Sequence, residues 1–399
     1  METPDILSPE FAANPYPVYQ EFRDNHPLLF HEGMNSYIIS RYEDVEKAFK
    51  DKVFSSRNYD WQLEPVHGRT ILQMEGTEHS RHRNLLNPAF RGRDLFEKFV
   101  PVIEKNAQDL IDKFPRDKNE IDFVSQFATI FPIGVIVDML GLPKSDLPKF
   151  HGWYTSIMAF LSNLTQDPAV TEAGLKTKVE FEEYMLKIIQ ERRENPGSDL
   201  LSTLCNAEID GVRMTDQEIK AFCSLLLTAG GETTDKALTL LFKNLIAHPE
   251  QMEAVRNDRT LIDKAFAETL RFAPPVHMIM RQPIEDVEMS GGTIPANATV
   301  TCLIGAANRD ERQYEQADKF DIFRSEIDQK KAFTGAANHT AFALGRHFCV
   351  GSLLAKVEVN MATNLILDNL KNIQFKDGSP QEVGVFTRAP QEMWITYDQ

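Results

Sequence analysis

Apolar residues recur at three- and four-residue intervals over most of the chain, the spacing that places them on one face of a helix. The longest such pattern covers residues 215–248 and begins with acidic residues, as helix N-termini do. Pro132 is expected to bend or delimit the helix in which it lies. Helices are also predicted over two short stretches, 17–22 and 42–49, and roughly over 94–113, 121–140, 144–162 and 172–194.

Strand patterns are shorter and fewer. They predict strands at Leu28–His31 and Ser36–Ile39, a β-hairpin over 287–303, and further strands at 384–388 and 393–396. The fold class predicted from these patterns is mainly α with a minor β portion. The α-rich part is expected roughly at 75–275 and 350–372, and the β portions roughly at 28–40, 276–303 and 375–399.

Composition narrows the class of protein. The chain has 399 residues, 42% of them hydrophobic, and no Pro-, Gly- or Ser-rich linker divides it, so we expect one domain over residues 1–399. Its formal net charge of −16 argues against nucleic acid or an anionic membrane as a general partner. No signal-peptide pattern and no apolar run of membrane-spanning length are present. The four cysteines form no CxxC pair, which is typical of a reducing cytosol, and a cytoplasmic location is expected.

One cysteine stands at a helix start. Cys349 lies directly before a helical pattern that begins at Ser352. Free N–H groups and the helix dipole favour an anion there, and the thiolate is the form of cysteine that binds a metal. Gly345 and Gly351 allow positive φ and a close approach to a flat ligand. The alternative is a buried free cysteine in a capping loop.

The centre of the 215–248 helix is also unusual. Gly230 and Gly231 are followed by Glu232 and Thr233. Two adjacent glycines cost a helix about 1 kcal/mol each relative to alanine, so the segment needs a compensation. One interpretation is close packing of another helix against the glycines. The other is a local opening that accommodates a small ligand beside an acid and an alcohol.

Two shorter motifs are ambiguous on their own. His79 and Arg83 are four residues apart and share a helix face, which is as typical of a solvated basic face as of a ligand site. Glu268 and Arg271 are three residues apart and can pair, in a helix that Pro274-Pro275 ends. Surface helices often carry such pairs, so this motif alone is weak evidence.

The stretch Phe342-Ala-Leu-Gly-Arg-His-Phe-Cys-Val-Gly351 resembles the haem-binding loop of the cytochrome P-450 superfamily. It departs from the commonest form at Ala343, where many members have glycine, a change that we expect to matter little. Ala229-Gly-x-Glu-Thr233 resembles the oxygen-activation motif of the same family, with glutamate where many members have aspartate. By this resemblance the chain is identified as a soluble, bacterial-type member.

The resemblance implies the cytochrome P-450 fold, a triangular prism-like single domain that holds b-type haem (iron protoporphyrin IX). It implies that Cys349 is the iron ligand, that Thr233 and Glu232 are catalytic, and that Glu268 and Arg271 form a structural ion pair. The other haem contacts that it implies, four of them basic groups for the propionates, are His79, Arg83, Ala229, Arg281, Phe342, Gly345, His347 and Gly351.

A substrate pocket is implied in the same way. Its residues are mostly apolar, so we expect an apolar ligand with few polar anchors. They are Tyr59, Trp61, Leu72, Leu226, Ala229, Val276, Met278, Ile279, Val385 and Phe386.

The function that the resemblance implies is a monooxygenase, which inserts one oxygen atom of O2 into a small, largely apolar organic molecule. Electrons are expected from NAD(P)H through a separate ferredoxin- or flavodoxin-type donor and its reductase, and the enzyme is expected to be a monomer without a membrane anchor. A peroxide-using haem-thiolate enzyme and a non-catalytic haem-binding or gas-sensing protein are the alternatives. The donor is expected to dock on the cysteine side of the haem, on a basic patch of Arg81, Arg91, Arg93, Arg346 and Lys356.

Overall fold

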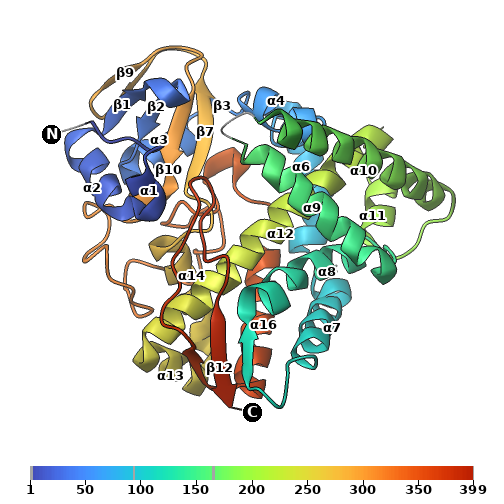
Figure 1. Ribbon diagram of the computed structural model, residues 1–399. Coiled ribbons are helices and arrows are strands. Elements are labelled where there is room, and N and C mark those ends of the chain that lie inside the picture. The colour runs from blue at the N-terminus through green and yellow to red at the C-terminus, as the bar shows by residue number, and fades with distance from the viewer. Residues whose placement is uncertain (1–2, 93–94, 164–166, 399) are drawn as a thin grey trace.

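The fold is mainly α with a minor β portion, as expected. The computed structural model describes residues 3–92, 95–163 and 167–398. Helix α12 (Asp216–Ala247) crosses the middle of the molecule, between an α-rich part and the larger sheet (Figure 1). The other longer helices are α6 (Gly76–Arg91), α7 (Val100–Ile111), α8 (Ile130–Met139), α9 (Leu147–Leu161), α10 (Pro168–Glu194), α14 (Ile262–Phe272) and α16 (Ser352–Asn369).

The remaining helices connect these elements. The α-helices among them are α1 (Pro9–Ala13), α2 (Pro15–Asn25), α3 (Tyr42–Lys50), α4 (Tyr59–Gln62), α5 (Glu64–His67), α11 (Leu200–Asn206), α13 (Pro249–Asn257) and α15 (Ile304–Ala307). The single turns of 3-10 or π-helix are η1 (Glu32–Met34), η2 (Leu95–Phe99), η3 (Val124–Ala128), η4 (Lys144–Asp146), η5 (Arg259–Leu261) and η6 (Gly345–His347).

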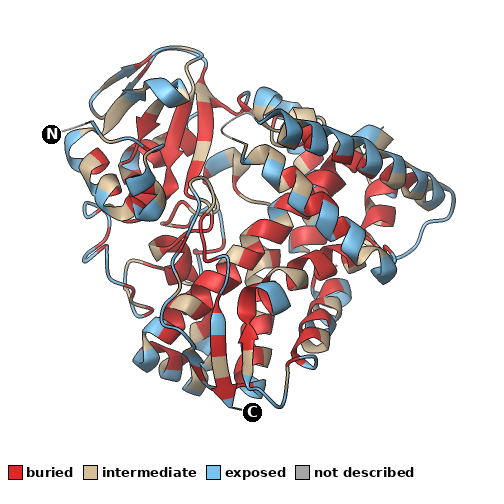
Figure 2. Ribbon diagram, in the orientation of Figure 1, coloured by how far each residue is buried: buried red, intermediate tan, exposed pale blue. Residues whose placement is uncertain are grey.

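Helix α12 is buried along most of its length because α8, α9, α10, α14 and α16 pack around it (Figure 2). A helix that is apolar on nearly every face belongs in a core. Its N-terminus is a capping box, in which the side chains of Thr215 and Glu218 each bond the backbone N–H of the other residue. No helix in the described part of the chain is long and apolar enough to cross a membrane.

The larger sheet holds the strand that carries Arg281. In this sheet β10 runs parallel to β2, and the other neighbours pair antiparallel, with Val300 opposite Arg281. Its strand order is β1 (Leu28–His31), β2 (Ser36–Ile39), β10 (Val300–Leu303), β7 (Met278–Pro283) and β3 (Phe54–Ser55). A second sheet has the order β11 (Lys371–Phe375), β12 (Trp394–Asp398) and β4 (Glu120–Asp122), and two hairpins join β5 (Glu208–Ile209) to β6 (Val212–Arg213) and β8 (Val287–Met289) to β9 (Gly292–Ile294).

Three local predictions were wrong. The hairpin expected over 287–303 includes only β8 and β9, because the fully buried β10 pairs inside the larger sheet instead. Residues 384–388 form part of a turn with isolated bridges and no strand. The stretch 121–140 begins as β4, passes through η3 and becomes helical at α8, so Pro132 lies in the first turn of α8, where proline is tolerated.

A buried ion pair ties α14 to the segment that follows β10. Arg271 binds the two carboxylate oxygens of Glu268 at 2.8 and 2.7 Å and donates to the carbonyls of Ala317 and Lys319. Arg324 also reaches Glu268, at 3.3 Å. Because both charges are buried and hydrogen-bonded, the pair holds the two segments together, and losing one partner would leave an uncompensated buried charge.

The Cys349 loop (residues 342–351) is a tight turn built on two left-handed residues. The Cys349 N–H donates to the Phe342 carbonyl at 2.9 Å, which closes the loop just before α16. Gly345 has φ +69° and lies against α3, where a Cβ would be 2.5 Å from the carbonyl oxygen of Phe49. Ala343 has φ +55°, a region that costs a residue with a Cβ about 1–2 kcal/mol. The alanine at this position is therefore strained, contrary to the expectation that it matters little.

Gly351 differs from the expectation of positive φ. It caps α16 with φ −81°, and an added Cβ would lie 3.9 Å from the sulfur of Cys349. Such a distance is an ordinary van der Waals contact, so neither backbone conformation nor space within the chain explains a glycine at this position.

We predict that Gly345→Ala lowers the free energy of unfolding by about 2–3 kcal/mol, because a left-handed alanine and a clash with the backbone of α3 add together. Denaturant unfolding measures the change. The matched control is Gly335→Ala, since a Cβ there would meet nothing closer than 4.0 Å. Equal stability of the two variants would contradict the packing described for Gly345.

Candidate active site

A cavity lies between α12 and the Cys349 loop, and most of the side chains around it are apolar. Helices α6, α12 and α16, strand β7 and the Cys349 loop form its walls. Among the haem contacts expected from the sequence, all but one line this cavity. The exception is Gly345, which instead packs against α3.

Cys349 lines the cavity and is partly exposed to it. Burial raises the pKa of its thiol, while the N–H groups of Gly351 and Ser352 and the charges of Arg83 and Arg91 act in the opposite direction. The sequence had suggested that the helix start would favour the thiolate. In the structure the effect of burial on the thiol pKa is larger than that of the helix start. Bonding to a metal ion removes a thiol proton outright, so a metal at the sulfur would reverse the balance.

Arg91 binds the Cys349 loop, a role that was not predicted from the sequence. Its guanidinium donates to the carbonyl of Cys349 at 3.1 Å and lies over the ring of Phe348, 5.2 Å from the centroid. Arg346 is likewise engaged, with its Nε 2.9 Å from the carboxylate of Glu75. Lys356 pairs with Asp263 at 3.0 Å. Two of the five residues of the expected docking patch are thus paired with acids, Arg91 is bound to the loop, and Arg93 lies outside the described residues.

Basic side chains gather at one edge of the cavity without matching acids. Arg281 is 4% exposed, and within the described chain its guanidinium reaches only the carbonyl of Met280, at 2.8 Å, and the ring face of Phe49. Arg83 has no hydrogen bond or ion pair with any described residue, and burial together with the charge of Arg91 lowers the pKa of its guanidinium. An unpaired buried cation is costly, so this edge needs an anion.

Two histidines lie beside these arginines. The rings of His79 and His347 are 4.5 Å apart, and burial, with the charges of His347 and Arg83, lowers the pKa of His79 to about 4. His347 is 3.5 Å from Glu75, the acid nearest to this group. The donor set fits the two propionates of a haem, the Cys349 sulfur fits its iron, and the apolar walls fit its ring.

Helix α12 forms the wall opposite Cys349. Thr233 donates to the carbonyl of Ala229 at 2.6 Å, and the helix continues without a break. An added Cβ on Gly230 would be 3.0 Å from Ile136 of α8, and α9 lies beside Gly231. The glycines are therefore explained by close helix packing, and the expected local opening is not present.

Glu232 points from α12 toward the C-terminal turn. One of its carboxylate oxygens, Oε1, accepts from the hydroxyl of Thr387 at 2.7 Å and is 3.1 Å from the ammonium of Lys236. Neither partner was identified from the sequence. Lys236 is four residues after Glu232, a spacing that predicts a helical ion pair, whereas Thr387 is distant in sequence and could be placed only by the fold.

One buried acid of α16 lines the cavity. Glu358 of α16 accepts from the hydroxyl of Thr234 at 3.4 Å, and burial raises its pKa to about 8. It was also missed, although it follows the buried Leu354 by one helical turn and so lies on the buried face of α16. A protonated carboxyl here leaves the cavity floor uncharged.

Eight of the ten expected pocket residues line the cavity, and Trp61 and Val385 do not. Tyr59, Gln62 and Leu63 share the face of α4 and its C-terminus that points into the cavity, so Trp61 points away and is 56% exposed. Val385 packs instead against an N-terminal apolar cluster. The role of the other eight as substrate contacts stays a prediction.

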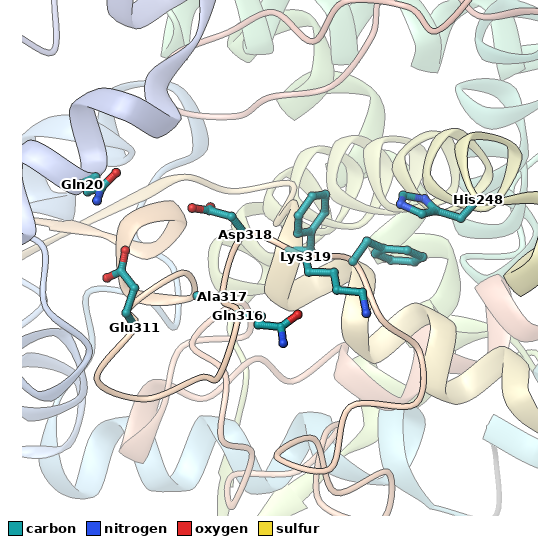
Figure 3. A pocket seen from close by; sticks show the side chains of 9 residues that line it. Gln20, His248, Glu311, Gln316, Ala317, Asp318 and Lys319 are labelled. Atoms are coloured by element: carbon teal, nitrogen blue, oxygen red, sulfur yellow. The ribbon is translucent and has the colours of Figure 1, made fainter.

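A second, open depression lies between α2, the end of α12 and the segment after α15 (Figure 3). Its acids are already paired: Glu311 with Arg23 at 2.7 Å and Asp318 with Arg309 at 3.0 Å. Nothing about its side chains points to a ligand.

Comparisons with known proteins point to one family. The sequence profile of the family described as Cytochrome P-450 matches residues 11–390. Pulcherriminic acid synthase of Bacillus subtilis is 38% identical over 98% of this chain and 97% of its own length.

Solved structures show the same fold. Cytochrome P-450 CYP109Q5 from Chondromyces apiculatus superposes with a TM-score of 0.87 at 30% identity, over 98% of this chain and 97% of that one. The complex of CYP109E1 from Bacillus megaterium with testosterone gives a TM-score of 0.85 at 26% identity, over 97% and 100%. The family profile and these relatives cover nearly the whole chain, and the Cys349 loop, the unpaired arginines and Thr233 of α12 line one cavity. The chain therefore belongs to the cytochrome P-450 family of haem-containing monooxygenases.

Proposed function

We propose that this protein holds b-type haem in the cavity and inserts one oxygen atom of O2 into a small, neutral, largely apolar molecule. The observation that carries the proposal is that Cys349 and Thr233 line one cavity, with unpaired cations at its edge. Glu232 lies next to Thr233 in α12 and is linked to the cavity lining through Thr387. The name of the Bacillus subtilis relative denotes the synthesis of a small acid, which supports a biosynthetic substrate here.

When bound, the haem supplies an iron at which O2 is activated, and a thiolate ligand donates electron density to it. Cys349 would supply that thiolate, held in place by the carbonyl of Phe342 behind its N–H and by Arg91 on its own carbonyl. Arg83 and Arg281, with the two histidines, would bind the propionates through charge-assisted hydrogen bonds.

Thr233 and Glu232 would bring protons to the cavity. Because the Thr233 hydroxyl donates to the Ala229 carbonyl, its lone pairs remain free to accept a proton donor in the cavity. Glu232 can take up a proton on the oxygen that Thr387 and Lys236 do not occupy, and pass it on. The apolar walls limit the entry of bulk water, so proton supply depends on these side chains.

The choice of oxidant tests the proposal. Purified holoenzyme is supplied either with NADPH, a surrogate ferredoxin and its reductase, or with hydrogen peroxide alone. We expect product, containing one atom from labelled O2, only with the redox chain. Turnover with peroxide alone would indicate the peroxide-using alternative, and spectral binding without turnover in either case would indicate a haem-binding protein.

We predict that Thr233→Ala lowers product formed per NADPH by roughly tenfold or more, while haem binding and NADPH consumption continue and peroxide accumulates. The reason is that the substitution removes the hydroxyl whose oxygen accepts a hydrogen bond from the proton donor in the cavity, but removes little volume. The matched control is Thr239→Ala on the same helix, remote from the cavity lining. Unchanged product per NADPH in Thr233→Ala would refute the proton-delivery role.

For the electron donor, we infer docking on the cysteine side through Arg81, a half-buried residue without an ion-pair partner in the described chain. Reduction by an acidic ferredoxin should slow as ionic strength rises, and slow several-fold in Arg81→Glu, because opposite charges steer association. Lys176→Glu on α10 makes the same charge change elsewhere and should leave the rate unchanged. Stopped-flow reduction rates that change neither with ionic strength nor in Arg81→Glu would contradict this docking site.

A further inference from the structure

Thr387 lies on the cavity wall in a turn whose backbone is fixed on several sides. The turn bridges to Val276, and the Phe386 carbonyl accepts from the N–H of His277 at 2.7 Å. Gly384 has φ +114°, and a Cβ there would collide with the carbonyl oxygen of Thr387. The conformation of the turn is therefore set by the fold and does not wait for a ligand.

Buried charges clamp the same turn to the rest of the molecule. The Arg388 guanidinium donates to the carbonyls of Ala12 and Ala13 at 2.7 and 2.8 Å. Lys243, from α12, binds Glu382 of the turn at 2.6 Å. Since both ends of the turn are anchored, the hydroxyl of Thr387 has a defined position at the cavity surface.

The hydrogen of that hydroxyl is already committed. It points to Oε1 of Glu232 at 2.7 Å, and the same oxygen lies 3.1 Å from the Lys236 ammonium. A carboxylate only accepts, so Thr387 must donate its single proton to Glu232. What remains for a molecule in the cavity is the pair of acceptor sites on the threonine oxygen.

The rest of the substrate side offers no charge among the described residues. The basic side chains that line the cavity belong to the propionate edge, and Glu358 lies at the floor on α16. The polar groups left on the substrate side are Tyr59, Gln62, Ser162, Thr233, Thr234 and Thr387. The hydroxyls of Thr233 and Thr234 donate to the Ala229 carbonyl and to Glu358, and the amide oxygen of Gln62 already accepts from Asn58 at 3.3 Å. An ionised substrate would find no counter-ion there.

We propose that Thr387 is a specificity residue that accepts a hydrogen bond from an N–H or O–H group of a neutral, otherwise apolar substrate. The inference rests on the proposed function of this cavity and adds the polarity of its substrate. It also couples substrate binding to proton supply, because the Thr387 oxygen that would accept from the substrate belongs to the hydroxyl bonded to Glu232. A molecule that offers only carbonyl oxygens would meet lone pairs at this point.

The test compares matched compounds by spectral-shift titration of the ferric holoenzyme. One pair is testosterone and the diketone obtained by oxidising its alcohol. Others are apolar cyclic amides with N–H and with N–CH3. We expect the donor-bearing member of the pairs to bind about 5- to 10-fold more tightly, the effect of one hydrogen bond of roughly 1 kcal/mol.

Variants assign the preference to the residue. Thr387→Val keeps the shape and should abolish the preference, whereas Thr387→Ser keeps the hydroxyl and should retain it. Thr387→Ala replaces the valine variant if that protein does not bind haem.

The outcomes separate this inference from the proposed function. Equal binding within every pair by the wild-type protein, failure of all donor-bearing compounds to bind, or a preference that survives loss of the hydroxyl overturns the role of Thr387. The carbon monoxide spectrum of the reduced wild-type protein is recorded in parallel. Absence of the thiolate-type band there would overturn the proposed function itself.

Discussion

The guanidinium of Arg281 is buried with no acid partner among the described residues, and that constraint organises the site. An isolated charge in a protein interior costs several kcal/mol unless an anion reaches it. Arg83 also lacks an acid partner among the described residues at the same cavity edge. Burial, with the charges of His347 and Arg83, lowers the pKa of His79 there to about 4. The fold thus leaves positive charge uncompensated at the cavity edge, which the carboxylates of a ligand would neutralise. The remaining walls of the cavity would hold such a ligand in one orientation.

Helix α12 makes that orientation possible because it contributes both packing and chemistry. Its glycines let α8 and α9 approach closely, which fixes the helix in the core. The next residues are Glu232, which accepts from Thr387, and Thr233, which lines the cavity. Its later turns hold the C-terminal turn through Lys243 and Glu382. The position of Glu232 is therefore coupled, through Thr387, to a surface that a substrate would touch.

Much of the fold and site could be predicted from the sequence because their signals are local. The long helix with its capping box, the start of α16 after Cys349, and the spacing of Glu268 and Arg271 each lie within a few residues. The pairing of β10 could not be predicted from the sequence, because burial, and not the nearest turn, decides which strands pair in a sheet. Thr387 and Glu232 are 155 residues apart, and no periodicity connects them. Trp61 was misplaced because a family resemblance indicates which segment lines the pocket but not which side of a one-turn helix faces inward.

The central claim is that Cys349 ligates a haem iron in this cavity, and the carbon monoxide spectrum of the reduced protein tests it most directly. Wild-type protein should show the strongly red-shifted band of a thiolate-ligated haem. Cys349→Ser should lose that band, while Cys205→Ser, at a buried cysteine away from the cavity lining, should keep it. The same red-shifted band in Cys349→Ser, or its absence from haem-loaded wild-type protein, would contradict the account.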